Sequence, residues 1–234
     1  MGTGLPDGDG WIRIPKTGSI TISGKGHPSI YEGRVSNMAK QLRMVWKNKE
    51  PVPAPLPEGY RIVDSSTREY TLDQIAAYWS DNCTELNGGK VFTKNEFLET
   101  QWNAPKTAAD SIFFVADPDG RLISTATAQI FDEHTGNLHM VGTSMDCKGK
   151  GAGRAVCTAC VRYFQKHNLT LAHLLTDDFR IPAIKIYVGL GYRPYLYDVD
   201  MKDRWTALLP ILGLKELEAY DENLDSVILT PAEA

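Results

Sequence analysis

The sequence has few of the features that mark secreted, disulfide-bonded or membrane-spanning proteins. It contains only four cysteines among 234 residues, and their spacing forms no disulfide framework. Reduced thiols and a cytoplasmic location are therefore expected. No run of apolar residues approaches the length of a membrane span. Residues 1–20 begin with Gly, Asp and Pro rather than with the basic and then apolar segments of a signal peptide, so no membrane partner is expected.

An excess of positive charge is also missing. Lys and Arg total 25 against 29 Asp and Glu, which gives a formal net charge of −4. Because general nucleic-acid binding requires a basic surface, no nucleic-acid partner is expected. Hydrophobic residues make up 42% of the chain, enough for the core of one domain of moderate size plus an extension.

Two common nucleotide-binding motifs are absent as well. A P-loop requires Gly-Lys followed by Ser or Thr, and neither residue follows the Gly-Lys pairs that end at Lys25, Lys90 and Lys150. A dinucleotide fingerprint that begins at Gly149 would need a third glycine where Arg154 stands. A nucleotide-dependent kinase or oxidoreductase is therefore disfavoured.

What the chain does have is a cluster of glycines and cations from Lys148 to Arg154, between an extended apolar run and a helical pattern. Its glycines occupy alternate positions, and its cations surround the same turn: Gly149, Gly151, Gly153, Lys148, Lys150 and Arg154. Uncovered N–H groups at the positive end of a helix dipole bind anions, most often phosphate. For such a segment taken alone, a solvated basic turn is the alternative.

This segment is similar to the acetyl-CoA pyrophosphate loop of the GNAT superfamily of N-acetyltransferases, Arg/Gln-x-x-Gly-x-Gly/Ala. Lys148 stands at the Arg/Gln position, and Gly151 and Gly153 match the two glycines. Downstream, the segment from Ala183 to Tyr192 resembles the family's Ala-x-x-x-Tyr-x-x-x-Gly-Phe/Tyr pattern. The resemblance covers roughly residues 60–200 and implies acetyl-CoA (coenzyme A) as the cofactor.

The resemblance also implies a set of cofactor contacts. In the family, the strands on either side of the glycine loop and its helix splay apart, and the pantetheine arm lies in the opening. The corresponding segments here are residues 138–145 and 171–176. The implied cofactor-binding residues are Val141, Gly142 and Thr143 on the first strand, and Lys148, Gly149, Lys150, Gly151, Ala152, Gly153 and Arg154 in the loop. A packing need or a simple bulge is an equal explanation for Gly142.

Two residues are candidates for proton transfer. Tyr187 falls on the family's tyrosine position, where the phenol commonly hydrogen-bonds or protonates the sulfur of CoA; a helix tyrosine packed on the sheet is the alternative. Strand alternation places Asn137, His139, Val141 and Thr143 on one side, and His139 is the only titratable group among them. Its ordinary pKa suits a general base near neutral pH. A purely structural role explains this residue equally well, as a half-buried strand histidine whose ring has a hydrogen-bond partner nearby.

Other titratable residues are weaker candidates. Glu133 and His134, in the preceding turn, are second choices for the base. Asp177 and Asp178 could bind a cationic substrate or cap the helix over 182–190, and capping is the simpler explanation.

The cysteines do not indicate a metal site. Cys157 and Cys160 lie within a predicted helix, and no second pair of ligands is spaced to complete four. We interpret both as packing residues. Cys147, beside the glycine loop, is a candidate reactive thiol.

The patterns and the resemblance together imply an α/β (α+β) GNAT fold. It would have a mixed, mostly antiparallel central sheet with a parallel splayed strand pair and helices on both faces. Residues 57–234 are expected to form the acetyltransferase domain. Residues 1–56 are expected to form an N-terminal extension with an amphipathic helix over 33–49 and a linker containing Pro51, Pro53, Pro55 and Pro57. Leu212–Tyr220 is expected to be a short helix.

The implied function is that of an acetyl-CoA-dependent N-acetyltransferase, which transfers an acyl group to a primary amine by direct attack. The acceptor would be a small-molecule or peptide amine, and a homodimer is left open. The alternative is a non-catalytic acyl-CoA-binding or regulatory module with a GNAT-like fold.

Overall fold

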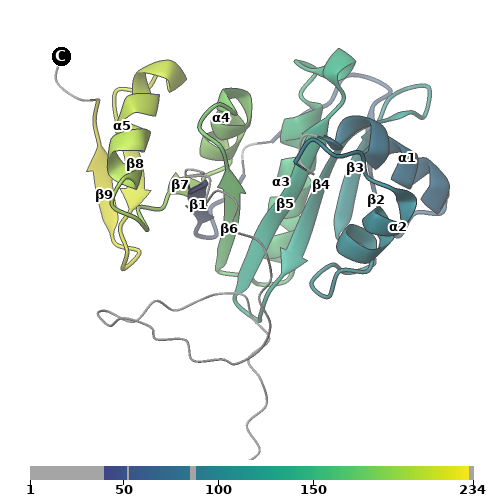
Figure 1. Ribbon diagram of the computed structural model, residues 1–234, viewed down its shortest axis with the longest axis horizontal. Coiled ribbons are helices and arrows are strands. Elements are labelled where there is room, and N and C mark those ends of the chain that lie inside the picture. The colour runs from purple at the N-terminus through teal and green to yellow at the C-terminus, as the bar shows by residue number, and fades with distance from the viewer. Residues whose placement is uncertain (1–39, 52, 85–87, 232–234) are drawn as a thin grey trace, which may run out of the picture. The chain divides into compact units, whose positions relative to one another are not determined.

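The computed structural model describes residues 40–51, 53–84 and 88–231 (Figure 1). Strands and helices alternate along much of this part of the chain. In chain order the α-helices and β-strands are β1 (Leu42–Trp46), β2 (Arg61–Asp64), α1 (Leu72–Asn82), α2 (Lys94–Phe97), β3 (Ile112–Ala116), β4 (Leu122–Ile130), β5 (Thr135–Thr143), α3 (Ala152–Lys166), β6 (Leu171–Thr176), α4 (Ile181–Gly189), β7 (Arg193–Pro194), α5 (Met201–Leu212), β8 (Leu217–Tyr220) and β9 (Ser226–Leu229). A π-helical turn, Leu98–Trp102, continues α2, and a 3-10 turn, Met145–Cys147, follows β5.

Seven of these strands form a mixed sheet in the order β2-β3-β4-β5-β6-β1-β7. Neighbouring strands run antiparallel, except that β5 and β6 are parallel and are connected through α3. Strands β8 and β9 form a separate antiparallel pair. The predicted mixed and mostly antiparallel sheet is therefore confirmed.

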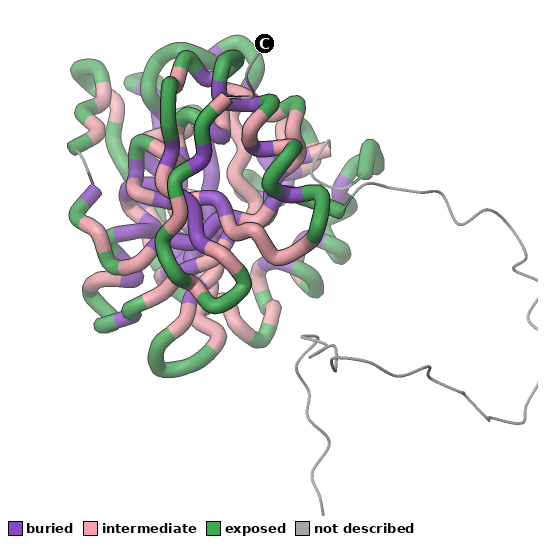
Figure 2. The backbone as a smooth tube through the Cα atoms, turned by 90° about the vertical axis from the view of Figure 1, so that its left-hand side faces the viewer, coloured by how far each residue is buried: buried purple, intermediate pink, exposed green. Residues whose placement is uncertain are grey.

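Helices cover both faces of the sheet, as Figure 1 shows. On one face, Phe164 of α3 and Ile184 of α4 belong to the same buried cluster as Leu138 and Leu174 of the sheet. On the other face, α1 and α2 pack on β3 in a second cluster, which includes Trp79, Phe97 and Phe114. Buried residues gather in the interior of the described part of the chain, and exposed ones lie around it (Figure 2).

Helix α1 begins with a capping box at Thr71. The side chain of Thr71 accepts a hydrogen bond from the backbone N–H of Gln74, and the Gln74 side chain accepts one from the N–H of Thr71. This reciprocal capping satisfies two N–H groups that have no partner inside the helix. Residues Ile75 and Trp79 then lie on its buried face.

The structure corrects the helix predicted over 33–49. Leu42–Trp46 form strand β1, which pairs with β6 on one side and β7 on the other. Apolar residues at positions 42, 44, 45 and 46 are all fully buried, as in a strand whose two faces are both covered. Pairing with distant strands therefore outweighs the local helical spacing. The rest of the predicted extension, residues 1–39, lies outside the described residues.

The helix predicted over Leu212–Tyr220 is also wrong. Helix α5 ends at Leu212, because Gly213 adopts the left-handed conformation with φ of 77°. Leu217–Tyr220 form strand β8, whose Leu217 and Ala219 are buried while Glu218 is half-buried. Within the described ranges, no helix is long and apolar enough to cross a membrane.

Candidate active site

The parallel strands β5 and β6 separate part of the way along their length. Their pairing runs from Thr135 opposite Leu171 to Asn137 opposite His173 and then stops. Beyond that point β5 continues to Thr143 without a partner on this side, while Leu174–Thr176 of β6 pair only with β1. The sheet is therefore open between residues 138–143 and 174–176, and the predicted splayed pair is confirmed.

A β-bulge reverses the side-chain alternation of β5 inside this opening. Thr127 of β4 lies opposite His139, but Thr125 lies opposite Gly142, so β5 has one extra residue between these pairs. Met140 at the bulge has a φ of 50°. His139 consequently faces the α1 and α2 side, while Thr143, opposite Ser124, faces α3. The prediction that His139, Val141 and Thr143 share one side is therefore wrong, because Val141 also packs on the α3 side.

The glycine loop leads from β5 directly into α3. Gly149 and Gly151 have φ values of 86° and 81°, which other residues rarely adopt, and Gly151 is the N-cap of the helix. A Cβ on Gly153 would lie 3.0 Å from Thr143 Oγ1, so this glycine permits close approach of the helix to β5. The first turn of the helix presents N–H groups that have no acceptor inside the helix.

The cations of the loop lie in different environments. Lys148 and Lys150 are exposed, and Lys150 Nζ lies 3.3 Å from the Tyr60 hydroxyl, to which it donates. Arg154 is half-buried, and its Nε is buried with no hydrogen-bond partner in the described part of the chain. Ala152 is buried, so only its backbone is available to a ligand. An unpaired buried guanidinium nitrogen next to bare N–H groups fits a phosphate-bearing cofactor.

Tyr187 lies in the main core, on α4. It is 6% exposed, and its ring lies 6.3 Å from that of Tyr192 in an edge-on arrangement. Burial raises the pKa of its phenol well above the usual range. The hydroxyl therefore stays protonated at neutral pH and is able to donate a hydrogen bond.

His139 is half-buried beside Thr127. Burial lowers the pKa of its imidazole, so the ring is neutral at pH 7 and able to accept a proton. Glu133 and His134, the second choices, are exposed in the turn before β5 and contact each other at 3.4 Å.

Asp177 and Asp178 do not cap α4, whose N-cap is Arg180 with no capping side chain. Asp177 forms an ion pair with Arg180 at 2.9 Å and accepts a hydrogen bond from Gln41. Asp178 pairs with Arg204 of α5 through two hydrogen bonds. The capping prediction is wrong, because arginines within reach give these carboxylates stronger, charge-assisted partners.

The cysteines have the packing role that the sequence indicates. Cys157 and Cys160 are fully buried in α3, and burial raises the pKa of both thiols. Cys147 is also buried with a raised pKa, so its thiol is not activated as a nucleophile. Across the residues that the structure describes, no group of three metal-ligating side chains comes together.

Comparison with known sequences decides the family. A sequence model described as the acetyltransferase (GNAT) family matches residues 72–192, just over half of the chain. The chain belongs to the acetyltransferase (GNAT) family. The matched region of this GNAT chain begins at α1 and ends directly after α4, so it contains the opening, the glycine loop and Tyr187.

Curated relatives are similar over part of their length. A mycothiol acetyltransferase from Thermomonospora curvata is 29% identical over 86 residues, which cover 37% of this chain and 29% of the relative. One from Segniliparus rotundus is 27% identical over 165 residues, covering 66% and 60%. The GNAT chain thus spans less than two thirds of these relatives.

A solved structure confirms the fold. A tandem GNAT protein from the clavulanic acid biosynthesis pathway superposes with a TM-score of 0.52 at 16% identity, covering 68% of this chain and 51% of that one. At this identity the similarity extends to the fold alone.

One contact in the GNAT site was not predicted from the sequence. The carbonyl of Gly142, on the open part of β5, accepts hydrogen bonds from Ser124 Oγ at 2.9 Å and from the Tyr78 hydroxyl at 3.4 Å. Tyr78 is buried on α1, so this contact connects α1 to the strand that borders the opening. Helical periodicity could place Tyr78 on a buried face, but it carries no information about a partner 64 residues away.

Proposed function

We propose that the protein transfers the acetyl group of acetyl-CoA to a primary amine by direct attack of the amine. The observation that carries this proposal is the opening between β5 and β6, with the glycine loop at one end of it. The N–H groups and the Arg154 guanidinium would bind the pyrophosphate, and the backbone of Val141, Gly142 and Thr143 would bind the pantetheine arm. Acetyl-CoA, when bound, supplies the acyl group as a thioester.

The two titratable residues would divide the proton transfers. An incoming ammonium must lose a proton before it can attack, and neutral His139 would accept that proton. The departing thiolate is stabilised by a proton donor, and the protonated phenol of Tyr187 would serve as that donor. Because burial shifts the two pKa values in opposite directions, each group has the protonation state that its role requires at pH 7.

For the acceptor we propose a class only, the primary amine of a small molecule or peptide. The name mycothiol acetyltransferase belongs to relatives that share 29% and 27% identity over the aligned segments. An amine library that includes amino acids, peptides and amino sugars is therefore the appropriate screen.

The first test is calorimetric titration of the full chain with acetyl-CoA, with NAD and ATP as controls. We expect binding of acetyl-CoA alone. Arg154→Gln should weaken it about tenfold or more, the equivalent of one lost charge-assisted hydrogen bond. Lys202→Gln, an exposed lysine on α5, is the matched control and should leave the affinity unchanged. No binding by folded protein would overturn the proposal.

Tyr187→Phe separates binding from chemistry. We expect an unchanged affinity for acetyl-CoA and a fall in kcat of about 10²-fold or more, as for loss of a general acid. Acetyl-CoA binding without turnover of any amine, by the unsubstituted protein, would instead support the non-catalytic acyl-CoA-binding alternative.

A further inference from the structure

A cavity of about 340 Å³ lies along α3, from Ala155 to Lys166. Its floor is the end of the sheet formed by β2 and β3, with Phe113 exposed to the cavity, and one wall is the side of α3 that carries Arg162, Tyr163 and Lys166. The opening between β5 and β6 adjoins other strands. None of the residues proposed to bind acetyl-CoA or to transfer protons lines this cavity.

One end of the cavity carries two carboxylates. Asp110 Oδ1 accepts a hydrogen bond from the Tyr163 hydroxyl at 3.0 Å, and Asp64 Oδ1 accepts one from the N–H of Ser66 at 2.8 Å. Both carboxylates line the cavity together with Tyr163. Neither carboxylate forms an ion pair with any described residue.

The helical wall carries two cations. Arg162 and Lys166 are four residues apart and therefore lie on one side of α3, one turn from each other. Both are exposed, and in the described chain neither forms an ion pair with Asp64, with Asp110 or with another carboxylate. The cavity is thus lined by charges of both signs that form no ion pair with each other.

We propose that this cavity is a binding site for a zwitterionic small molecule, of the class of a free α-amino acid with an apolar side chain. Its ammonium group would bind Asp110 and Asp64, and its carboxylate would bind the planar guanidinium of Arg162, supported by Lys166. The side chain would pack on Phe113. A simple amine would leave the two cations without a partner, and a simple acid would leave the two carboxylates without one.

The site is separate from the proposed transfer reaction but shares α3 with it. The first turn of this helix follows the glycine loop, and residues from Ala155 to Lys166 of the same helix line the cavity. A ligand that binds only the folded chain stabilises it by mass action, so an amino acid bound here should raise the melting temperature.

The test uses the full chain without acetyl-CoA and three matched probes. L-leucine is the zwitterion, 3-methylbutylamine lacks its carboxylate, and 4-methylpentanoate lacks its ammonium. Each is titrated calorimetrically to about 10 mM, because two charge-assisted hydrogen bonds should give measurable binding in that range. We expect L-leucine to bind at least about tenfold more tightly than either analogue.

Substitutions of the charged residues that line the cavity test whether L-leucine binds there. Asp110→Asn keeps an oxygen that can accept from Tyr163 but removes the charge, and Arg162→Gln combined with Lys166→Gln removes the opposite pair. Each should weaken L-leucine binding about tenfold or more, with unchanged acetyl-CoA affinity. Asp203→Asn and Lys202→Gln, exposed on α5, are charge-matched controls and should have no effect.

Three results would overturn the proposal. One is the absence of L-leucine binding to folded protein. Another is equal binding of the amine, which would indicate a plain cation site. The third is L-leucine binding that Asp110→Asn leaves unchanged, which would place the amino acid outside this cavity.

Discussion

At the scale of single residues, two histidines lie close to the point where β5 and β6 separate. His139 of β5 and His173 of β6 lie on the same face of the sheet. His173 is opposite Asn137, the last paired residue, and His139 follows two positions later. Burial lowers the pKa of both rings. For His173 the pKa falls to about 4, because the charge of Arg43 lowers it further while that of Asp132 raises it. Both rings are therefore neutral under physiological conditions.

The lowered pKa of His173 has a consequence for stability at low pH. The unfolded chain takes up a proton on this histidine near pH 6.5, whereas the folded chain does so only near pH 4. Folding stability should therefore be complete above pH 6.5 and decrease as the pH falls to 4, by about 3 kcal/mol from this residue. Urea denaturation at several pH values measures the change.

The variant that tests this prediction is His173→Gln. Its free energy of unfolding should depend less steeply on pH between pH 4 and pH 6.5 than that of the unsubstituted chain. His134→Gln, at an exposed position, should keep the full dependence. An identical pH dependence in His173→Gln and the unsubstituted chain would contradict the prediction.

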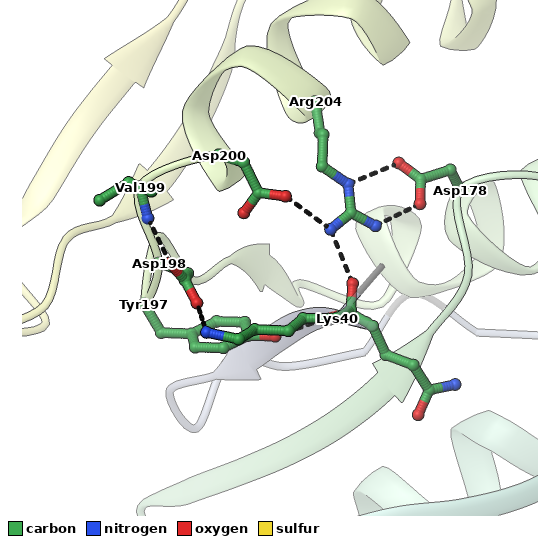
Figure 3. A network of polar contacts seen from close by, with 8 residues as sticks. Lys40, Asp178, Tyr197, Asp198, Val199, Asp200 and Arg204 are labelled. Carbon is green, nitrogen blue, oxygen red and sulfur yellow. Dashed lines mark hydrogen bonds and ion pairs between the residues drawn. The ribbon is translucent and has the colours of Figure 1, made fainter. Parts of the chain in front are cut away.

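At the scale of elements, Arg204 connects three segments that are distant in the sequence. From α5 it donates to both carboxylate oxygens of Asp178 after β6, to Asp200, and to the carbonyl of Lys40 before β1 at 2.6 Å (Figure 3). Nearby, Lys40 pairs with Asp198, and the Tyr197 hydroxyl donates to the carbonyl of Gln41 at 2.7 Å (Figure 3). These contacts hold the start of β1 beside the end of β6.

Removing the Arg204 side chain should loosen this connection. We expect Arg204→Ala to lower the free energy of unfolding by about 1–3 kcal/mol, since the Lys40 carbonyl and Asp178 both lose their donor. The measurement is urea denaturation, with Lys202→Ala on the same helix as the matched control, expected within about 0.5 kcal/mol of the unsubstituted chain. Equal stability of the two variants would show that the contact contributes nothing.

At the scale of the whole molecule, an early segment of the chain occupies the interior of the sheet. Strand β1 precedes every other described strand, yet it lies between β6 and β7, which come more than 120 residues later. Its residues Leu42, Met44, Val45 and Trp46 are fully buried. Burial of each such side chain stabilises the fold by about 1.5–3 kcal/mol, so the loss of all four is large compared with the net stability of about 5–15 kcal/mol of a typical domain.

Two truncations test this arrangement. A chain that begins at residue 40 retains β1, whereas one that begins at residue 57 lacks it. We expect the shorter chain to be unfolded or aggregated and the longer one to show a cooperative thermal transition, measured by circular dichroism. A cooperative transition at the same temperature in both chains would mean that β1 is dispensable.

Local chemistry in the sequence was sufficient to predict several parts of the fold and site. The Asp117-Pro118-Asp119-Gly120 turn and the cap at Thr71 follow from the short-range conformational preferences of the residues that form them. The glycine loop at the start of α3 was predictable for the same reason, because glycine conformation and a helix N-terminus are local properties. The roles of His139 and Tyr187 remain proposals.

The tertiary structure determined the features that depend on contacts between residues distant in the sequence. Residues 42–46 satisfy a helical spacing, yet pairing with β6 and β7 makes them a strand. One extra residue at the bulge next to Met140 turns Thr143 away from the side of His139, and only the register with β4 reveals it. The cavity beside α3 likewise depends on residues from β2, β3 and α3 that lie far apart in the chain. Short-range preferences are encoded within a few residues, whereas register, side-chain direction and cavities arise only when separate segments meet.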